Sequence, residues 1–277
     1  MPLTSKLKRK RGYGIFYFHF RSKGKVGKLK ISKKLVDLTL KTGLPPIDTA
    51  FFPCLDSEGN TKAYYAMQIL NTVEFGILTP SDFRVVAGRT NQCVRLADKA
   101  LDKVFLELRR REVTLGDYEY IMVEAPRQML EDGSLVKNLE EHLGSGDFSV
   151  RSRLCVLFGA EILLTDPEAT VPRLEEIRRL GIHIGVTDFG DESTSTLRLA
   201  RFPFEVVVLE PSVSSLVEQG NLPALGAVVS FAASLGMQVF MNAALSEEKR
   251  ALAHSAGVAA VFDSSLKSTE EVITQNG

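Results

Sequence analysis

The 277-residue sequence has no tryptophan, only three cysteines and four histidines, and no stretch of about 18 consecutive apolar residues. Cys54, Cys93 and Cys155 lack metal-ligand spacing and are too few for a disulfide-stabilised scaffold, which is typical of a reducing cytoplasm. Without a long apolar run, no membrane-spanning helix or secretory signal is expected. We therefore predict a cytoplasmic globular protein without a zinc site or other cofactor.

Net charge is zero, but the charges are distributed unevenly along the chain. The first 44 residues hold 13 Lys or Arg and one acid, Asp37, whereas the remainder has a matching excess of acids. Aromatic residues gather at 13–20, and Pro45-Pro46 marks a boundary. We predict a basic arm over 1–44 and a second unit over 45–277. The sequence leaves three alternatives for what the arm contacts: the acidic body of the same chain, an anionic membrane surface or nucleic acid.

Strand-like and helix-like stretches alternate through the second unit. The turn at 56–60 predicts that the first two strands form an antiparallel hairpin. Strands are expected at 51–55, 62–70, 120–124, 154–158, 182–186, 205–209, 238–241 and 258–262, and helices at 81–111, 168–180, 222–235 and 247–256. This α/β alternation favours parallel strands covered by helices, as in a (β/α)8-type barrel, with an open doubly wound sheet as the alternative.

Several segments carry a family resemblance. Gly181-Ile-His-Ile-Gly-Val-Thr-Asp-Phe-Gly190, followed by DESTSTLRLARFPFEVVVLEPSV, resembles the Asp-Asp-Phe-Gly region of the EAL family of cyclic di-GMP phosphodiesterases. Gly76-Ile-Leu-Thr-Pro80 with Phe83 resembles that family's Gly-x-Ile-x-Pro-x-x-Phe. The resemblance covers 48–277. It implies an EAL-type (β/α)8 barrel variant with one antiparallel strand, and a bacterial role in cyclic di-GMP signalling.

The resemblance also implies where a site would lie. Active members of the family hold two divalent ions with carboxylates and one amide at strand ends, and hydrolyse a phosphodiester bond. Ten positions of this chain align with functional positions of the family, but most of them hold a different residue and the few matches are isolated. These positions are Tyr65, Ile69, Glu124, Glu161, Thr187, Asp188, Val208, Glu210, Asn242 and Leu245. Tyr65 stands at the signature glutamate and Val208 at the lysine. The alignment therefore predicts no catalytic residue, no metal ligand and no enzyme.

Three functions stay open at this point. The leading hypothesis is a catalytically inactive EAL-like module that acts through an unidentified protein partner, with a homodimer as a further alternative. The second is a cyclic di-GMP receptor without hydrolysis. Its affinity would be weakened because each lost charge-assisted contact costs about 1.5–3 kcal/mol, unless Arg84, Arg89 or the basic arm replaces it. The third is a diverged metal-dependent phosphodiesterase with relocated ligands.

For the relocated ligands, one candidate is an acidic cluster that would hold a single cation. Its members would be Glu124, Glu161, Asp188 and Glu210, which all follow or end predicted strands. The alternative for Asp188 is a local capping role beside Phe189-Gly190.

Overall fold

The computed structural model describes residues 47–72, 76–89, 92–111, 118–144, 148–190 and 196–265. The basic arm predicted over 1–44 lies outside the described residues, so this division of the chain stays a prediction. In the described ranges, no helix has both the length and the apolar character needed to cross a membrane.

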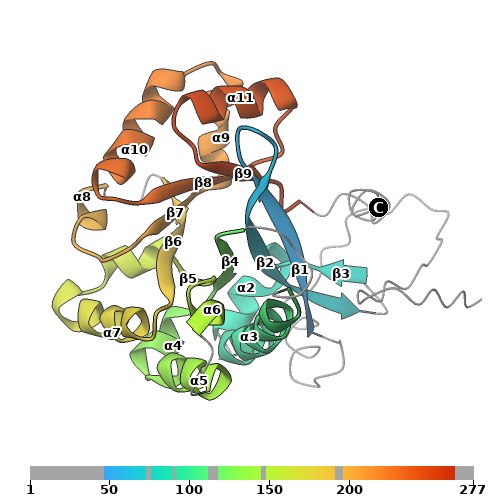
Figure 1. Cartoon of the computed structure of the whole chain (residues 1–277), viewed down its shortest axis with the longest axis vertical. Helices are drawn as coiled ribbons and strands as arrows, with labels where there is room; N and C mark the ends of the chain where they lie inside the picture. Colours follow the sequence, from blue (N-terminus) through green and yellow to red (C-terminus); the bar gives the residue numbers. More distant parts are fainter. Residues whose placement is uncertain are drawn as a thin grey trace, which may run out of the picture.

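Eight strands close into a barrel because β1 pairs with both β2 and β9. The strands are β1 (Ile47–Leu55), β2 (Thr61–Thr72), β4 (Tyr120–Glu124), β5 (Leu154–Gly159), β6 (His183–Phe189), β7 (Val206–Leu209), β8 (Gln238–Asn242) and β9 (Ala260–Phe262). β1 runs antiparallel to both neighbours, and the other pairs in the ring are parallel. The short β3 (Gly76–Leu78) pairs antiparallel with the end of β2, outside the ring. This confirms the predicted barrel with one antiparallel strand (Figure 1).

Helices lie outside the ring of strands, as Figure 1 shows for α3, α7 and α10. They are α2 (Pro80–Arg89), α3 (Gln92–Arg111), α4 (Arg127–Glu131), α5 (Ser134–Leu143), α6 (Phe148–Arg151), α7 (Pro167–Arg179), α8 (Thr196–Leu199), α9 (Ser214–Glu218), α10 (Leu222–Ser234) and α11 (Glu247–Ser255), with short 3₁₀ turns η1 (Ala160–Leu164) and η2 (Pro211–Val213). The single helix predicted over 81–111 is therefore two helices, α2 and α3. The two residues between them, Thr90 and Asn91, are weak helix formers, and so is Gly88 near the end of α2.

Local sequence explains where helix α7 begins and ends. Asp166 precedes the helix, and its carboxylate accepts a hydrogen bond from the Glu168 amide, while Pro167 occupies the first helical position. Gly181 follows the helix with φ at +81°, a conformation that glycine adopts without a steric penalty. The chain then turns directly into β6.

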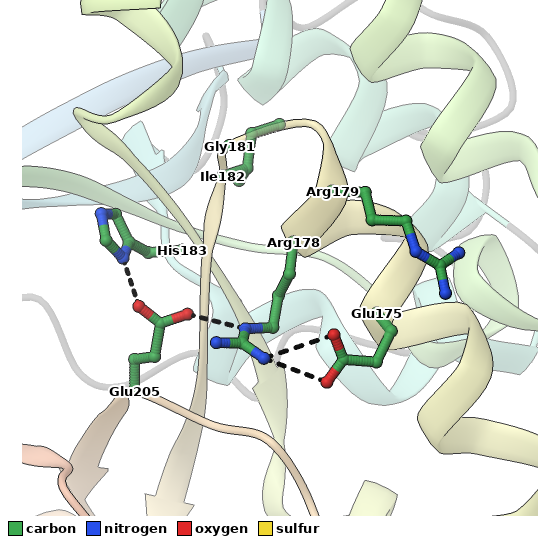
Figure 2. Close-up of a pocket in the computed structure, with 7 residues that line it drawn as sticks. All are labelled: Glu175, Arg178, Arg179, Gly181, Ile182, His183 and Glu205. Carbon is green, nitrogen blue, oxygen red and sulfur yellow. Dashed lines mark hydrogen bonds and ion pairs between the residues drawn. The ribbon is translucent and has the colours of Figure 1, made fainter.

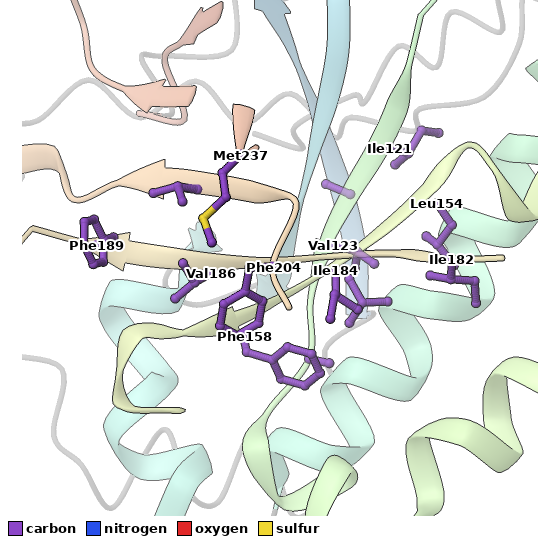
Figure 3. Packing of buried hydrophobic residues seen from close by; sticks show 14 of the residues in the cluster. Ile121, Val123, Leu154, Phe158, Ile182, Ile184, Val186, Phe189, Phe204 and Met237 are labelled. Carbon is purple, nitrogen blue, oxygen red and sulfur yellow. The ribbon is translucent and has the colours of Figure 1, made fainter. Parts of the chain in front are cut away.

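Both faces of the strands are buried, because one faces the barrel interior and the other faces the helices. Along β6, Ile184 and Val186 pack in the outer core beneath the helices (Figure 3), while Gly185 between them faces the interior. The interior is filled by a second cluster that includes Tyr65, Phe240 and Phe262. The barrel is therefore solid below its two ends, and a site can form only at an end.

Candidate functional site

The carboxyl-terminal ends of the parallel strands meet at one end of the barrel, here called the mouth. Glu124 is the last residue of β4, Asp188 lies near the end of β6, Glu210 follows β7 and Asn242 ends β8. Four positions predicted from the sequence are thus brought to the same end of the barrel.

An arginine from outside the parallel strands binds two of these groups. Arg84 Nη1 donates a hydrogen bond to Asp188 Oδ2 at 2.8 Å, and Arg84 Nη2 donates to Glu124 Oε2 at 2.9 Å. Arg84 lies on α2, where the neighbouring Phe83 is buried in a small cluster with Leu70 and so anchors the helix. The guanidinium therefore bridges the ends of β4 and β6, with about half of its side chain exposed to solvent.

Glu124 has a second partner on the other side. The Tyr65 hydroxyl donates to Glu124 Oε1, and the Tyr65 ring packs against Phe262 with ring centroids 4.8 Å apart. Burial, together with the charge of Glu124, raises the pKa of Tyr65 well above its usual value, so the phenol stays protonated and remains a donor. This aligned tyrosine is thus the immediate neighbour of a carboxylate at the mouth.

The charges at the mouth act on one another. Burial raises the pKa of the Glu124 carboxyl, and the charges of Asp188 and Glu161 raise it further, while Arg84 and the Tyr65 hydrogen bond lower it. The charge of Glu124 in turn raises the pKa of Arg84, which therefore stays a cation. The Arg84 guanidinium therefore stabilises the ionised form of a half-buried carboxylate.

The remaining predicted site positions serve packing or local capping. Ile69 and Val208 belong to the interior cluster, Thr187 is buried, and Leu245 packs against the outer core. Glu210 accepts hydrogen bonds from the backbone amide, at 2.8 Å, and the hydroxyl of Ser212, and so caps η2. The predicted four-carboxylate cluster is therefore divided, since Glu210 is engaged in this cap.

Two features of the mouth were not predicted from the sequence. Asn242 Nδ2 donates to Ser264 Oγ at 2.8 Å, and the Ser264 amide donates back to Asn242 Oδ1 at 3.2 Å. Asp188 has φ at +57°, a left-handed conformation that aspartate tolerates better than most residues. This conformation occurs where its carboxylate meets Arg84, and no sequence signal marks it.

The donors at the mouth can be compared with the divalent ions that the family resemblance implies. Across the residues that the structure describes, no three His, Cys, Asp or Glu side chains gather closely enough to hold a metal ion. Glu124 and Asp188 are both bound by the same guanidinium. In this arrangement the pair does not fit a divalent ion, because the position of the cation is taken by Arg84.

A pocket lies at the opposite, amino-terminal end of β6 and β7. Figure 2 shows Glu205 between two partners: it accepts from Arg178 Nε at 3.1 Å and from His183 Nδ1 at 2.5 Å. Arg178 also binds Glu175 at 3.0 Å. The Arg178 guanidinium is thus already matched by carboxylates, although its neighbour Arg179 also lines the pocket.

Comparison with known proteins decides the family. The family model of the EAL domain matches residues 47–262. This chain belongs to the EAL domain family. A curated relative, the cyclic di-GMP phosphodiesterase RocR of Pseudomonas aeruginosa, is 26% identical over 185 residues, which covers 65% of this chain and 46% of RocR. The chain therefore spans about half the length of this relative.

Solved structures share the fold. The PaMucR phosphodiesterase in complex with c-di-GMP superposes with a TM-score of 0.72 at 18% identity, over 83% of this chain and 94% of that one. The FimX EAL domain of Xanthomonas citri in complex with c-diGMP has a TM-score of 0.68 at 17% identity, over 82% and 89% of the two chains. At these identities, the superpositions show that the barrel is an EAL barrel.

The prediction that the chain is not an enzyme is contradicted by these relationships. The curated relative is a phosphodiesterase, and so is one of the structural neighbours. The prediction depended on aligning single residues with family motifs, and such an alignment does not show where ligands come from in three dimensions. On this point the prediction was wrong.

Proposed function

We propose that this chain is a cyclic di-GMP signalling domain that binds the dinucleotide at the mouth of its barrel. Membership of the EAL family over residues 47–262 and the phosphodiesterase relative support this ligand. The observation that carries the proposal is the position of Arg84, whose guanidinium lies half-exposed over the strand ends. The low cysteine content supports a cytoplasmic setting.

The chemistry of the ligand explains why Arg84 matters. Cyclic di-GMP carries two phosphodiester charges, and a guanidinium can donate two parallel hydrogen bonds to a phosphate. Glu124 and Asp188 compete for the same donors. Binding therefore requires the phosphate to displace or share these carboxylates, and the affinity will fall steeply as salt screens the charges.

Titration calorimetry with cyclic di-GMP tests this proposal. We expect saturable binding to the intact chain and, for Arg84→Ala, an affinity lower by about ten-fold or more, because one charge-assisted contact is lost. Arg178→Ala is the matched control: it removes the same charge at the opposite end of the barrel, in the pocket of Figure 2. Its affinity should stay within about two-fold of the wild-type value.

Two results would contradict the proposal. If the wild-type protein shows no saturable binding, cyclic di-GMP is not its ligand. If Arg84→Ala and Arg178→Ala lose affinity equally, the dinucleotide does not bind at the mouth. Analysis of the nucleotide after each titration, with and without Mg²⁺, reports separately whether the bound dinucleotide is converted to its linear form.

A second candidate function is self-association, because two leucines are exposed on neighbouring segments, η1 and α8. Leu164 at the end of η1 is 62% exposed and Leu197 on α8 is 76% exposed. Arg198 joins the two segments, since its guanidinium donates to the carbonyl oxygens of Leu163 and Thr165. A second copy of the chain that covered this pair would remove apolar surface from water.

Sedimentation equilibrium tests the second candidate. The double variant Leu164→Ser/Leu197→Ser should weaken dimerisation by about ten-fold or more if these side chains are central to an interface. Leu235→Ser, at the end of α10 and 36% exposed, serves as the control. A monomeric wild-type chain, or equal weakening by the control, would reject this interface.

A further inference from the structure

The Arg84 bridge joins three segments that are far apart in the sequence. Arg84 comes from α2, Glu124 ends β4 and Asp188 lies near the end of β6. Both ion pairs have hydrogen-bond geometry, at 2.9 and 2.8 Å, and they use different nitrogens of one guanidinium. Because the two nitrogens are held in a planar fork, the arginine can satisfy both carboxylates at once.

The carboxylates on either side of β5 are close to a third acid. β5 lies between β4 and β6, and its last residue, Gly159, has no side chain. The Glu161 carboxylate occupies the space where a Cβ on Gly159 would lie. The charge of Glu161 accordingly acts on Glu124 and raises its pKa in the same direction as Asp188 does.

Arg84 supplies the positive charge that offsets the repulsion between these carboxylates. One guanidinium binds both Glu124 and Asp188, and the charge of Glu161 also acts on Glu124, whose side chain is only 24% exposed. Removing the arginine would leave carboxylates that repel one another and attract any cation of suitable size. Carboxylate oxygens are also the donors that Mg²⁺ and Mn²⁺ prefer.

We propose that Arg84 is the resident cation of the mouth and that its guanidinium keeps divalent ions off Glu124 and Asp188. The arginine is covalently tethered beside the carboxylates, so its effective concentration is high and a free ion must displace it. The misfit between this mouth and a divalent ion is therefore a property of one side chain. The inference goes beyond dinucleotide binding and does not depend on it.

Titration with Mn²⁺ alone, followed by calorimetry and by loss of the free-ion electron paramagnetic resonance signal, tests the inference. Arg84→Gln should bind Mn²⁺ about ten-fold or more tightly than the wild-type chain, because the competing cation is gone. Arg127→Gln is the matched control. Arg127 pairs with Glu131 at 3.3 Å, and its loss changes net charge equally.

A second pair of variants tests the site itself. Arg84→Gln/Glu124→Gln should lose the gain in Mn²⁺ affinity, because one of the two released carboxylates is then neutral. Arg84→Lys should bind Mn²⁺ more weakly than Arg84→Gln and more tightly than the wild type, since the ammonium keeps a tethered positive charge at the mouth but lacks the planar fork that holds both carboxylates. Circular dichroism of each variant verifies that the barrel is folded, and Arg84→Lys keeps the inference testable if Arg84→Gln does not fold.

Three outcomes would overturn the inference. The first is that Arg84→Gln and Arg127→Gln gain Mn²⁺ affinity equally, which would be a general charge effect. The second is that the wild-type chain already binds Mn²⁺ as tightly as Arg84→Gln. The third is that Arg84→Lys binds Mn²⁺ as tightly as Arg84→Gln does. No dinucleotide is present in these titrations, so a failure of the proposed ligand leaves their result unchanged.

Discussion

Replacing Phe240 by alanine is expected to lower the free energy of unfolding by about 3–5 kcal/mol, the usual range for removing a fully buried phenylalanine. Phe240 lies in the middle of β8, is fully buried, and belongs to the cluster that fills the barrel interior. Its strand neighbours in register are Val208 and Ala260, which are too small to fill the space left behind. Since β8 is hydrogen-bonded on both sides, the barrel cannot collapse into the cavity.

Urea unfolding followed by circular dichroism measures this loss. Leu197→Ala is the control, because Leu197 is 76% exposed and its truncation should change the free energy of unfolding by less than about 0.5 kcal/mol. A Phe240→Ala variant that lost less than about 1 kcal/mol would show that the interior is loosely packed, contrary to the structure.

Much of the barrel was predictable because its elements have local causes. Strand β4 was predicted with the same bounds as it has in the structure, since Tyr120–Glu124 is a short apolar run next to turn residues. The hairpin between β1 and β2 was predicted from the turn, and Asp56 Oδ1 indeed accepts from the amides of Glu58 and Asn60, each at 2.9 Å. In these segments, neighbours along the chain determine the structure.

Closure of the barrel could not be derived in this way. It depends on pairing between β1 and β9, where Leu55 lies opposite Val261. No local pattern distinguishes this pairing from two free edges of an open sheet. The resemblance to the EAL family supplied the closed topology, together with the antiparallel strand.

The mouth shows the same division between local and distant causes. Because the carboxyl ends of parallel strands meet at one end of a barrel, Glu124 and Asp188 were expected there. The cap in which the Glu210 carboxylate accepts from the Ser212 amide is likewise short-range, between residues two apart. The bridge by Arg84 was not predicted. The sequence offered Arg84 only as a general replacement for a phosphate contact, because nothing in α2 indicates which strand ends it faces.

The wrong prediction about catalysis has a related origin. It was inferred from which residues stand at aligned positions, such as Tyr65 and Val208. The structure shows that aligned positions differ in what they contact: Tyr65 binds a carboxylate at the mouth, whereas Val208 lies in the apolar interior. The chemistry of the mouth depends on the group of side chains that meet there, including Arg84 of α2, which was not among the ten aligned site positions.

Two glycine-to-alanine substitutions are expected to change stability in opposite directions. A Cβ on Gly185 would lie 2.6 Å from the Val206 carbonyl oxygen and 2.8 Å from Leu157 Cδ2, so β6 must move away from β5 or β7. This overpacking should lower the free energy of unfolding by about 1–3 kcal/mol. A Cβ on Gly226 of α10 would have no atom within 4 Å apart from its chain neighbours and its own helix backbone, so Gly226→Ala should raise the free energy of unfolding by about 0.5–1 kcal/mol through better helix propensity.

The pair is informative because both variants add one methyl group, in one case to a strand with no space for it and in the other to a helix with open space around it. Urea unfolding of Gly185→Ala and Gly226→Ala, compared with the wild type, gives both changes in one experiment. Since β6 also carries Asp188, a shifted β6 should weaken the ion pair with Arg84, and Mn²⁺ affinity should then rise in Gly185→Ala but not in Gly226→Ala. Equal stability of the two variants would show that the strands around Gly185 are farther apart than the structure places them.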